Sequence, residues 1–253
     1  MDSKLRFSDR AENYAKYRPR YPEAVFEFLK QECGIDSSSE VADVGAGTGI
    51  FAGQIAPFVA RAFAIEPNRE MRQEAAKHLA DVPNVAILDG SAEQVPLEDS
   101  SVNLVTAAQA FHWFDQESAR TEFARILRPP GWVALIWNVR DPGKDAFQEQ
   151  FDQWLQTWAP NYKGANHGES ELSRIEGFFG PKSFKKAVFR NAHFLFWEEL
   201  LGRTLSSSYF PLPTSGQHDQ SVQALKEIFD DQKVGGRVNF DYRTEVYLGM
   251  LDH

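Results

Sequence analysis

Short apolar segments alternate with helical patterns between residues 40 and 138, and this alternation restricts the possible folds more than any other feature of the chain. The apolar segments are rich in Val, Ile, Leu and Phe and are bounded by turn residues, as is typical of strands buried on both faces. The expected strands are Glu40–Val44, Ala62–Ile65, Val85–Leu88, Val102–Thr106 and Val133–Trp137. Strands and helices that alternate over this length predict a doubly wound, mostly parallel α/β sheet.

The segments between the strands carry apolar stripes at helical spacing. Met71, Ala75 and Leu79 fall four residues apart, and a second stripe begins at Ala119 and includes Phe123. Each stripe is suited to cover one face of a sheet. Upstream, a helix is expected to begin at Pro22 and to end at Gly34, since proline favours the first turn and glycine the end of a helix.

The part of the chain after residue 140 is less regular. Residues 141–182 contain aromatic residues at helical spacing and then a loop with Pro160, Gly164 and Gly168. We interpret this segment as an inserted cap, with a peripheral helix pair that only packs as the alternative. Apolar and polar residues alternate from Val238 to Leu248, which predicts a strand with one wetter face at an antiparallel position, and Ala187–Phe196 is its expected partner.

Composition restricts the partners of the chain. Its 253 residues suit a single elaborated domain, and its formal net charge of −9 disfavours nucleic acid, because phosphate contacts require basic surfaces. The single cysteine, Cys33, excludes an internal disulfide and a zinc site built from cysteines. No apolar run approaches the length of a transmembrane helix. We therefore expect a cytoplasmic protein, a monomer or a homodimer, that acts on a small molecule without binding a membrane or a metal.

A glycine-rich loop connects the first expected strand to the following helix. The segment Val41–Gly49 reads Val-Ala-Asp-Val-Gly-Ala-Gly-Thr-Gly. Its glycines permit positive φ angles and close approach of a ligand to the backbone. A dinucleotide-binding loop requires a third glycine where this chain has Ile50, and the lysine of a P-loop is missing too. The loop thus lacks the spacing of a pyrophosphate-binding site.

Asp43 through Gly49 resembles the first motif of the class I S-adenosylmethionine-dependent methyltransferases. The cofactor of this family contains adenosine and methionine but no phosphate, in agreement with the spacing of the loop. The resemblance implies a Rossmann-like fold with an antiparallel C-terminal strand, to which the cap at 141–182 would be added. It covers residues 7 to about 140 well and 183–253 loosely. The resemblance thus implies that residues 1–253 form one methyltransferase domain. Its parts are a lid and helix at 7–34, a cofactor-binding core at 40–140, the inserted cap at 141–182, and strands and a helix at 183–253 that complete the sheet.

An acidic residue follows the second expected strand. A carboxylate at Glu66 can accept both hydroxyl groups of a ribose, as acids do in dinucleotide-binding folds, and the resembled family uses its acid in this way. The alternative is that Glu66 only begins the next helix, before Pro67. After the third strand, Asp89–Leu97 resembles the segment of the family that contacts adenine, with Ser91 where an aspartate is common.

The end of the fourth strand, Thr106–Asp115, resembles the fourth motif of the family. Its His-Trp-Phe sequence, together with the N-terminal segment from Phe7 to Pro22, is similar to the branch that includes trans-aconitate methyltransferase. Tyr14 or Trp113 is suited to contact the sulfonium through a cation–π interaction, and Arg18 to pair with a carboxylate of the cofactor or of the substrate. The residues expected to contact the cofactor are Tyr14, Arg18, Asp43, Gly45, Ala46, Gly47, Thr48, Gly49, Glu66, Pro67, Met71, Ser91, Ala92, Glu93, Gln109, Ala110 and Trp113.

The reaction sets the requirement for a general base. A carboxylate or a free amine needs little proton chemistry as a methyl acceptor, whereas a hydroxyl or an acidic carbon needs a base. His112 is the best-placed candidate base, and the alternative is a histidine beside Trp113 that only orients a group or packs.

We therefore expect a methyltransferase for a small molecule, with a carboxylate or another oxygen as acceptor. Three rival functions can be compared with this expectation. A nucleic-acid methyltransferase usually has Asn/Asp-Pro-Pro-aromatic after the fourth strand, which Ala108–Phe111 does not match. A nicotinamide-dependent oxidoreductase disagrees with the loop spacing. A non-catalytic module that binds S-adenosylmethionine would share the same cofactor residues and stays open.

Overall fold

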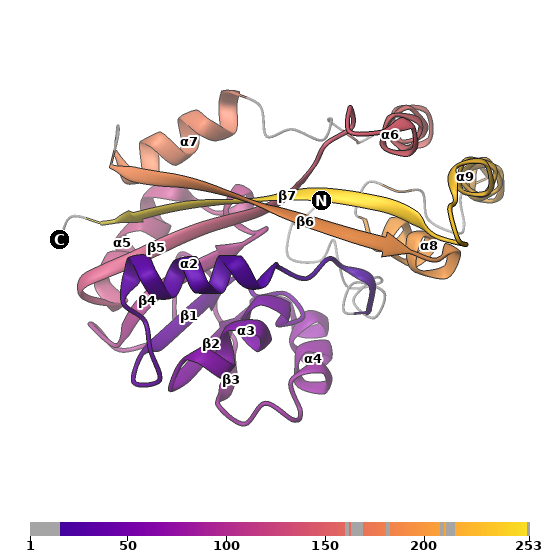
Figure 1. The fold of residues 1–253 in the computed structure, drawn as a ribbon. Coiled ribbons are helices and arrows are strands. Elements are labelled where there is room, and N and C mark those ends of the chain that lie inside the picture. Colours follow the sequence, from indigo (N-terminus) through magenta and orange to yellow (C-terminus); the bar gives the residue numbers. More distant parts are fainter. Residues whose placement is uncertain are drawn as a thin grey trace.

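The computed structural model describes residues 16–159, 162, 169–180, 183–207, 210 and 216–251. One seven-stranded sheet organises this part of the chain, with the strand order β3-β2-β1-β4-β5-β7-β6 (Figure 1). The strands are β1 (Glu40–Val44), β2 (Arg61–Ile65), β3 (Val85–Leu88), β4 (Val102–Ala108), β5 (Leu127–Arg140), β6 (Phe184–Leu195) and β7 (Val238–Met250).

The first five strands run parallel, and the last pair is antiparallel. Strand β1 pairs with β2 and β4, β2 with β3, and β4 with β5, all in parallel register. Strand β7 then pairs antiparallel with both β5 and β6. The expected doubly wound sheet with an antiparallel C-terminal strand is confirmed. The fifth strand is longer than its apolar run predicts, because pairing with β7 continues through Arg140, where the sequence is no longer apolar.

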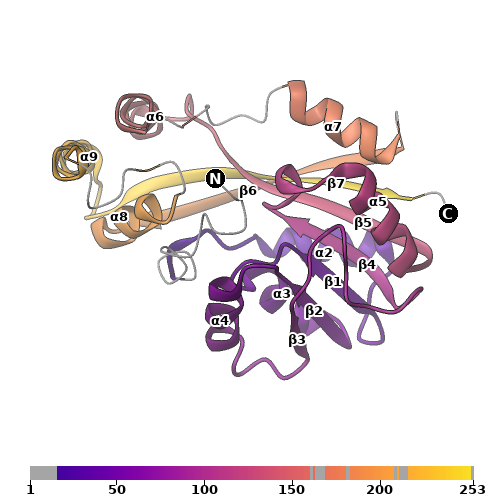
Figure 2. The same ribbon diagram turned by 180° about the vertical axis from the view of Figure 1, so that it is seen from behind.

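Helices cover both faces of the sheet (Figures 1 and 2). They are α2 (Glu23–Cys33), α3 (Ile50–Ile55), α4 (Arg69–His78), α5 (Gln116–Ile126), α6 (Ala146–Trp158), α7 (Glu169–Phe179), α8 (Trp197–Leu205) and α9 (His218–Gln232), with short 3-10 turns η3 (Ala56–Phe58) and η4 (Phe111–Trp113). Helix α2 ends as expected at Gly34, which has a φ of 66° and donates its N–H to the carbonyl of Lys30.

Two apolar cores lie on opposite faces of the sheet. Helices α2 and α3 pack on one face, where Phe26 and Phe51 meet Ile136 and Leu248. Helices α5 and α7 pack on the other face, where Phe123 and Phe178 are fully buried. The expected wetter face of β7 is present at Asn239, Arg243 and Glu245, which are exposed or half-buried, whereas Tyr247 on the same face is buried and packs edge-on against Trp137.

A third apolar cluster lies at the far end of β6 and β7 and joins α6, α8 and α9. The range 141–182, which we expected to be one cap, is therefore divided between two places. Helix α6 contributes Phe147, Phe151 and Trp154 to this third cluster, whereas α7 packs against α5 and β7 in the core of the sheet. The cap formed by α6, α8 and α9 thus combines segments that are far apart in the sequence.

Candidate functional site

The loop between β1 and α3 lies against the ends of β2 and β4. The N–H groups of Gly45 and Ala46 both donate to the carbonyl of Ile65, at 2.8 and 3.0 Å. Gly45, with a φ of 70°, approaches Ala110 so closely that a Cβ at Gly45 would lie 2.5 Å from the Cβ of Ala110. The loop has no room for a side chain at this position, which leaves bare backbone at the floor of a cleft.

Thr48 and Gly49, which were expected to contact the cofactor, do not line that cleft. Thr48 is fully buried. A Cβ at Gly49 would meet the side chain of Leu79 at 2.5 Å, so glycine is needed here for the contact between the start of α3 and the end of α4. The third glycine of the motif has a packing role, and its positive φ of 76° forms the N-cap of α3.

Glu66 joins the end of β2 to the glycine loop. One carboxylate oxygen, Oε2, accepts the N–H of Gly47 at 2.9 Å, and the other, Oε1, accepts the N–H of Asn68 at 2.9 Å. Burial raises the pKa of Glu66, and these two N–H groups oppose the increase. Each carboxylate oxygen can accept more than one hydrogen bond, so Glu66 keeps capacity for hydroxyl donors.

A cleft of about 800 Å³, counted with the solvent space at its mouth, opens above Gly45 and Glu66. It is mostly apolar, and Trp113 and Phe114 from the turn after β4 form part of its wall. Its lining consists of Gly45, Gly47, Glu66, Pro67, Asn68, Met71, Ser91, Ala92, Glu93, Gln109, Ala110, Trp113 and Phe114. Eleven of these thirteen residues are among those expected to contact the cofactor, and Asn68 and Phe114 are new.

A second, smaller cleft of about 480 Å³ shares Gly45 and Gln109 with the first. Its lining is Arg18, Pro19, Tyr21, Asp43, Gly45, Ala46, Ile50, Phe51, Ala108, Gln109 and Asn138. Gln109 has a φ of 59°, an uncommon conformation for a residue other than glycine, and it donates from Nε2 to the carbonyl of Asn138 at 3.1 Å. The strained turn at the end of β4 therefore forms the boundary between the two clefts.

Asp43 is buried at the side of the second cleft. Its Oδ1 accepts a hydrogen bond from Oγ1 of Thr106 at 2.9 Å, and its Oδ2 has no hydrogen-bond partner among the described residues. Burial raises the pKa of Asp43 to about 7, and the nearby charge of Glu66 adds to the increase, while the hydroxyl of Thr106 and the backbone N–H of Ala52 oppose it. A cationic group placed beside Oδ2 would stabilise the ionised carboxylate.

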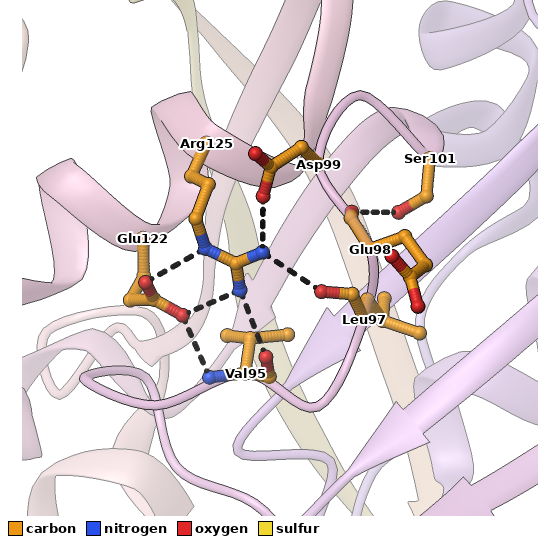
Figure 3. A network of polar contacts seen from close by, with 7 residues as sticks. All are labelled: Val95, Leu97, Glu98, Asp99, Ser101, Glu122 and Arg125. Carbon is orange, nitrogen blue, oxygen red and sulfur yellow. Dashed lines mark hydrogen bonds and ion pairs between the residues drawn. The ribbon is translucent and has the colours of Figure 1, made fainter.

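The segment that carries Ser91 and Glu93 is held in place from α5. Arg125 donates hydrogen bonds to the carbonyls of Val95 and Leu97 and forms ion pairs with Asp99 and Glu122, while Glu122 accepts the N–H of Val95 (Figure 3). One guanidinium thus fixes a long turn on one side of the first cleft.

Two further predicted residues are not among those that line the clefts. Tyr14 falls outside the described residues. His112, the candidate base, lines neither cleft; its ring lies 4.9 Å from that of Trp113, and its carbonyl accepts a hydrogen bond from Arg174. Asn68 could have been found from the sequence, because an asparagine two residues after Glu66 is placed to cap α4, and it does accept the N–H of Met71.

Comparison with known proteins agrees with this geometry. Residues 42–135 match the model of a methyltransferase domain family. An uncharacterized methyltransferase of Schizosaccharomyces pombe is 39% identical over 134 residues, which make up 51% of this chain and 51% of the relative. One from Mycobacterium tuberculosis is 36% identical over 140 residues, 55% of each chain. The chain spans about half the length of these curated relatives.

Similarity in structure extends further than similarity in sequence. A protein of Anaeromyxobacter dehalogenans, solved as a candidate type II methyltransferase, superposes with a TM-score of 0.65 at 22% identity and covers 94% of this chain and 100% of its own. At this identity the likeness establishes the fold. In the part of the chain that the structure describes, no helix is long and apolar enough to cross a membrane. The family match and the relatives support a methyltransferase domain over residues 42–135, the part of the chain that the family model covers, and the fold agrees with this assignment.

Proposed function

We propose that the chain is an S-adenosylmethionine-dependent methyltransferase that methylates an oxygen of a small molecule, such as a carboxylate. The observation that carries this proposal is the pair of clefts that meet at Gly45 and Gln109, with a carboxylate at the side of each. Glu66 is placed to accept the ribose hydroxyls in the first cleft, and Asp43 to accept the amino group of the methionine part in the second. When bound, S-adenosylmethionine supplies a methyl group that its sulfonium activates for displacement.

The protein residues around the clefts position and shield the reacting groups. The backbone at Gly45 allows close approach, and Trp113, which is 39% exposed, can lie against a cation through its ring. Because His112 lines neither cleft, an acceptor that is already ionised at neutral pH suits the site best. Membership of the branch that includes trans-aconitate methyltransferase stays a prediction.

A binding and turnover experiment tests the proposal. Calorimetry with S-adenosylmethionine measures binding, and transfer of a labelled methyl group to pooled small metabolites measures catalysis. We expect both binding and transfer. Binding without transfer to any pool would favour a non-catalytic module, and the absence of binding would contradict the proposed function.

We expect Glu66→Ala to weaken the binding of S-adenosylmethionine by about 1–3 kcal/mol, the usual cost of losing a charge-assisted hydrogen bond. The substitution also removes the acceptor for the N–H groups of Gly47 and Asn68. Glu66→Gln is the matched control for shape, because its amide oxygen can still accept one of these N–H groups, and it should weaken binding less. Calorimetry on both variants checks this result; unchanged affinity in Glu66→Ala would exclude Glu66 from the site.

Affinity for S-adenosylmethionine should increase as the pH is raised from about 6 to 7.5, because Asp43, with a pKa of about 7, becomes ionised and attracts the amino group of the ligand. In the ligand-free protein, the contribution of Asp43 to stability changes with pH in the opposite direction. Burial raises the pKa of Asp43 above its ordinary value of 3.8, so its contribution to stability is full below pH 3.8 and is lost as the pH rises toward 7.

The variant Asp43→Asn tests whether ionisation of Asp43, and not of another group, causes this pH dependence of affinity. Its amide oxygen can still accept from Thr106, but it does not ionise. The variant should bind more weakly at pH 7.5 and lose most of the increase in affinity between pH 6 and 7.5, as measured by calorimetry at several pH values. An equally steep increase in Asp43→Asn would assign the pH dependence to another group, with Glu66 as the first candidate because burial raises its pKa as well.

A further inference from the structure

The carboxyl end of β5 extends past the second cleft toward the cap, and it carries the polar side chains of Asn138 and Arg140. In the sheet, Asn138 pairs with Thr244 of β7, and Arg140 pairs with Tyr242. Tyr242 pairs on its other side with Asn191 of β6. Paired residues on neighbouring strands point to the same face. These five side chains therefore form one continuous patch, which Asn138 connects to the second cleft.

The amide of Asn138 has a fixed orientation. Its Oδ1 accepts hydrogen bonds from Oγ1 of Thr244 at 2.6 Å and from Nδ2 of Asn191 at 3.1 Å. Two donors on one atom identify it as the oxygen, so the other atom must be the nitrogen. This Nδ2 is buried and has no partner among the described residues, although Asn138 lines the second cleft and is only 9% exposed.

Two arginines on the same patch also have donors without a partner. Arg203 of α8 lies over the rings of Phe240 and Tyr242, each at 5.7 Å, and donates from Nε to the carbonyl of Tyr17. Arg140 pairs with Asp152 at 2.8 Å through Nη2. The Nη1 atoms of both arginines are buried and have no hydrogen-bond partner in the part of the chain that the structure describes.

Three buried donors without acceptors on one patch are costly, because buried polar groups are almost always paired. All three are N–H groups, and two belong to guanidinium ions, so the missing partner is an acceptor that carries negative charge. Of the two arginines, only Arg140 has a carboxylate within ion-pair distance among the described residues. Burial, with the charge of Arg203 second, lowers the pKa of His193 to about 4, which leaves this histidine neutral at neutral pH.

Resting on the proposed function, we propose that Asn138 and Arg203, supported by Arg140, form a subsite for an anionic group of the methyl acceptor, a carboxylate or a phosphate monoester. The subsite continues from the second cleft, so an acceptor held there extends from the end of β5 toward the cofactor. The carboxylates Asp43 and Glu66 face the cationic cofactor, whereas the donors of Asn138 and Arg203 face the anionic acceptor. Opposite charges are thereby directed to opposite ends of the site.

Matched pairs of ligands test this subsite in the protein saturated with S-adenosylhomocysteine. The pairs are succinate and succinamide, butanoate and butanamide, and phenyl phosphate and phenol, each tested for its effect on the midpoint of thermal unfolding. We expect the anionic member of at least one pair to raise the midpoint and its neutral partner not to do so. A response to the carboxylates alone or to the phosphate alone identifies the group. If every neutral partner acts as strongly as its anion, or if no anion acts, the proposal is wrong.

Two substitutions locate the effect. Asn138→Asp keeps an oxygen for Thr244 and Asn191 but replaces the unpartnered donor by an acceptor, and Arg203→Gln removes the charge. Each should weaken binding of the anion roughly 10–100-fold. Affinity for S-adenosylmethionine should change little in Arg203→Gln, because Arg203 lines neither cleft. The control Arg190→Gln removes an exposed arginine of β6 that has its nearest carboxylate 3.8 Å away, and it should change neither affinity.

The two variants test the anion subsite independently of the proposed methyltransferase function. Because Asn138→Asp buries a carboxylate, its folding is checked by thermal unfolding, and Arg203→Gln gives a second test if it does not fold. Unchanged anion binding in a folded variant of either kind would overturn the subsite and leave the methyltransferase proposal intact. Loss of S-adenosylmethionine binding by the unmodified protein would instead contradict the proposed function.

Discussion

Replacing Gly45 with alanine is expected to weaken binding of S-adenosylmethionine by about a hundredfold or more, roughly 3 kcal/mol. Two costs combine at this position. The φ of 70° costs an ordinary residue roughly 1–2 kcal/mol, and the new Cβ would lie 2.5 Å from the Cβ of Ala110. Neither the new methyl at position 45 nor that of Ala110 can rotate out of the way, so the backbone of the loop or of the turn after β4 must shift. Calorimetry measures the affinity, and circular dichroism shows whether the variant is folded.

The matched control is Gly143→Ala. Gly143 lies in the turn before α6, and a Cβ there would meet nothing within 4 Å. This variant should bind S-adenosylmethionine as the unmodified protein does. If Gly45→Ala were folded and bound the cofactor equally well, the bare backbone at Gly45 would not be the floor of the cofactor site, and the proposed placement of the ligand would be wrong.

The core of the fold could be predicted because its signals are local. Expected strands such as Glu40–Val44 and Val85–Leu88 are short, mostly apolar segments between turn residues, and the structure places both strands at the expected bounds. The loop from Gly45 and the acid at Glu66 lie next to these strands in the sequence. Parallel strands bring their carboxyl ends to one edge, so most of the first cleft follows from strand order alone.

The features that were not predicted depend on contacts between distant segments. Nothing near Asn138 in the sequence indicates that Thr244 and Asn191 orient its amide, because these partners belong to strands more than 50 residues away. The separate positions of α6 and α7 likewise follow from which distant helices they meet. Gly49 illustrates another limit, since a motif glycine that serves packing against Leu79 has the same sequence signature as one that contacts a ligand.

Phe123→Ala is expected to lower the free energy of unfolding by about 3–5 kcal/mol, the usual cost of removing a buried phenylalanine. Phe123 of α5 is fully buried, and its ring lies edge-on to Phe114 at 6.2 Å and to Phe178 of α7 at 6.0 Å. For a chain of this size, such a loss lowers the midpoint of thermal unfolding by roughly 6–20 °C. Urea denaturation and thermal unfolding measure the effect.

The controls for this prediction distinguish packing from mere loss of an aromatic ring. Phe194 of β6 is 62% exposed, so Phe194→Ala should change stability by no more than about 0.5 kcal/mol. A loss below about 1 kcal/mol in Phe123→Ala would contradict the packing of α5 and α7 on the sheet.

Phe114 connects this core to the site, since it contacts Phe123 and also lines the first cleft. The cavity left by Phe123→Ala should therefore loosen one wall of that cleft and weaken cofactor binding, whereas Phe194→Ala should leave it unchanged.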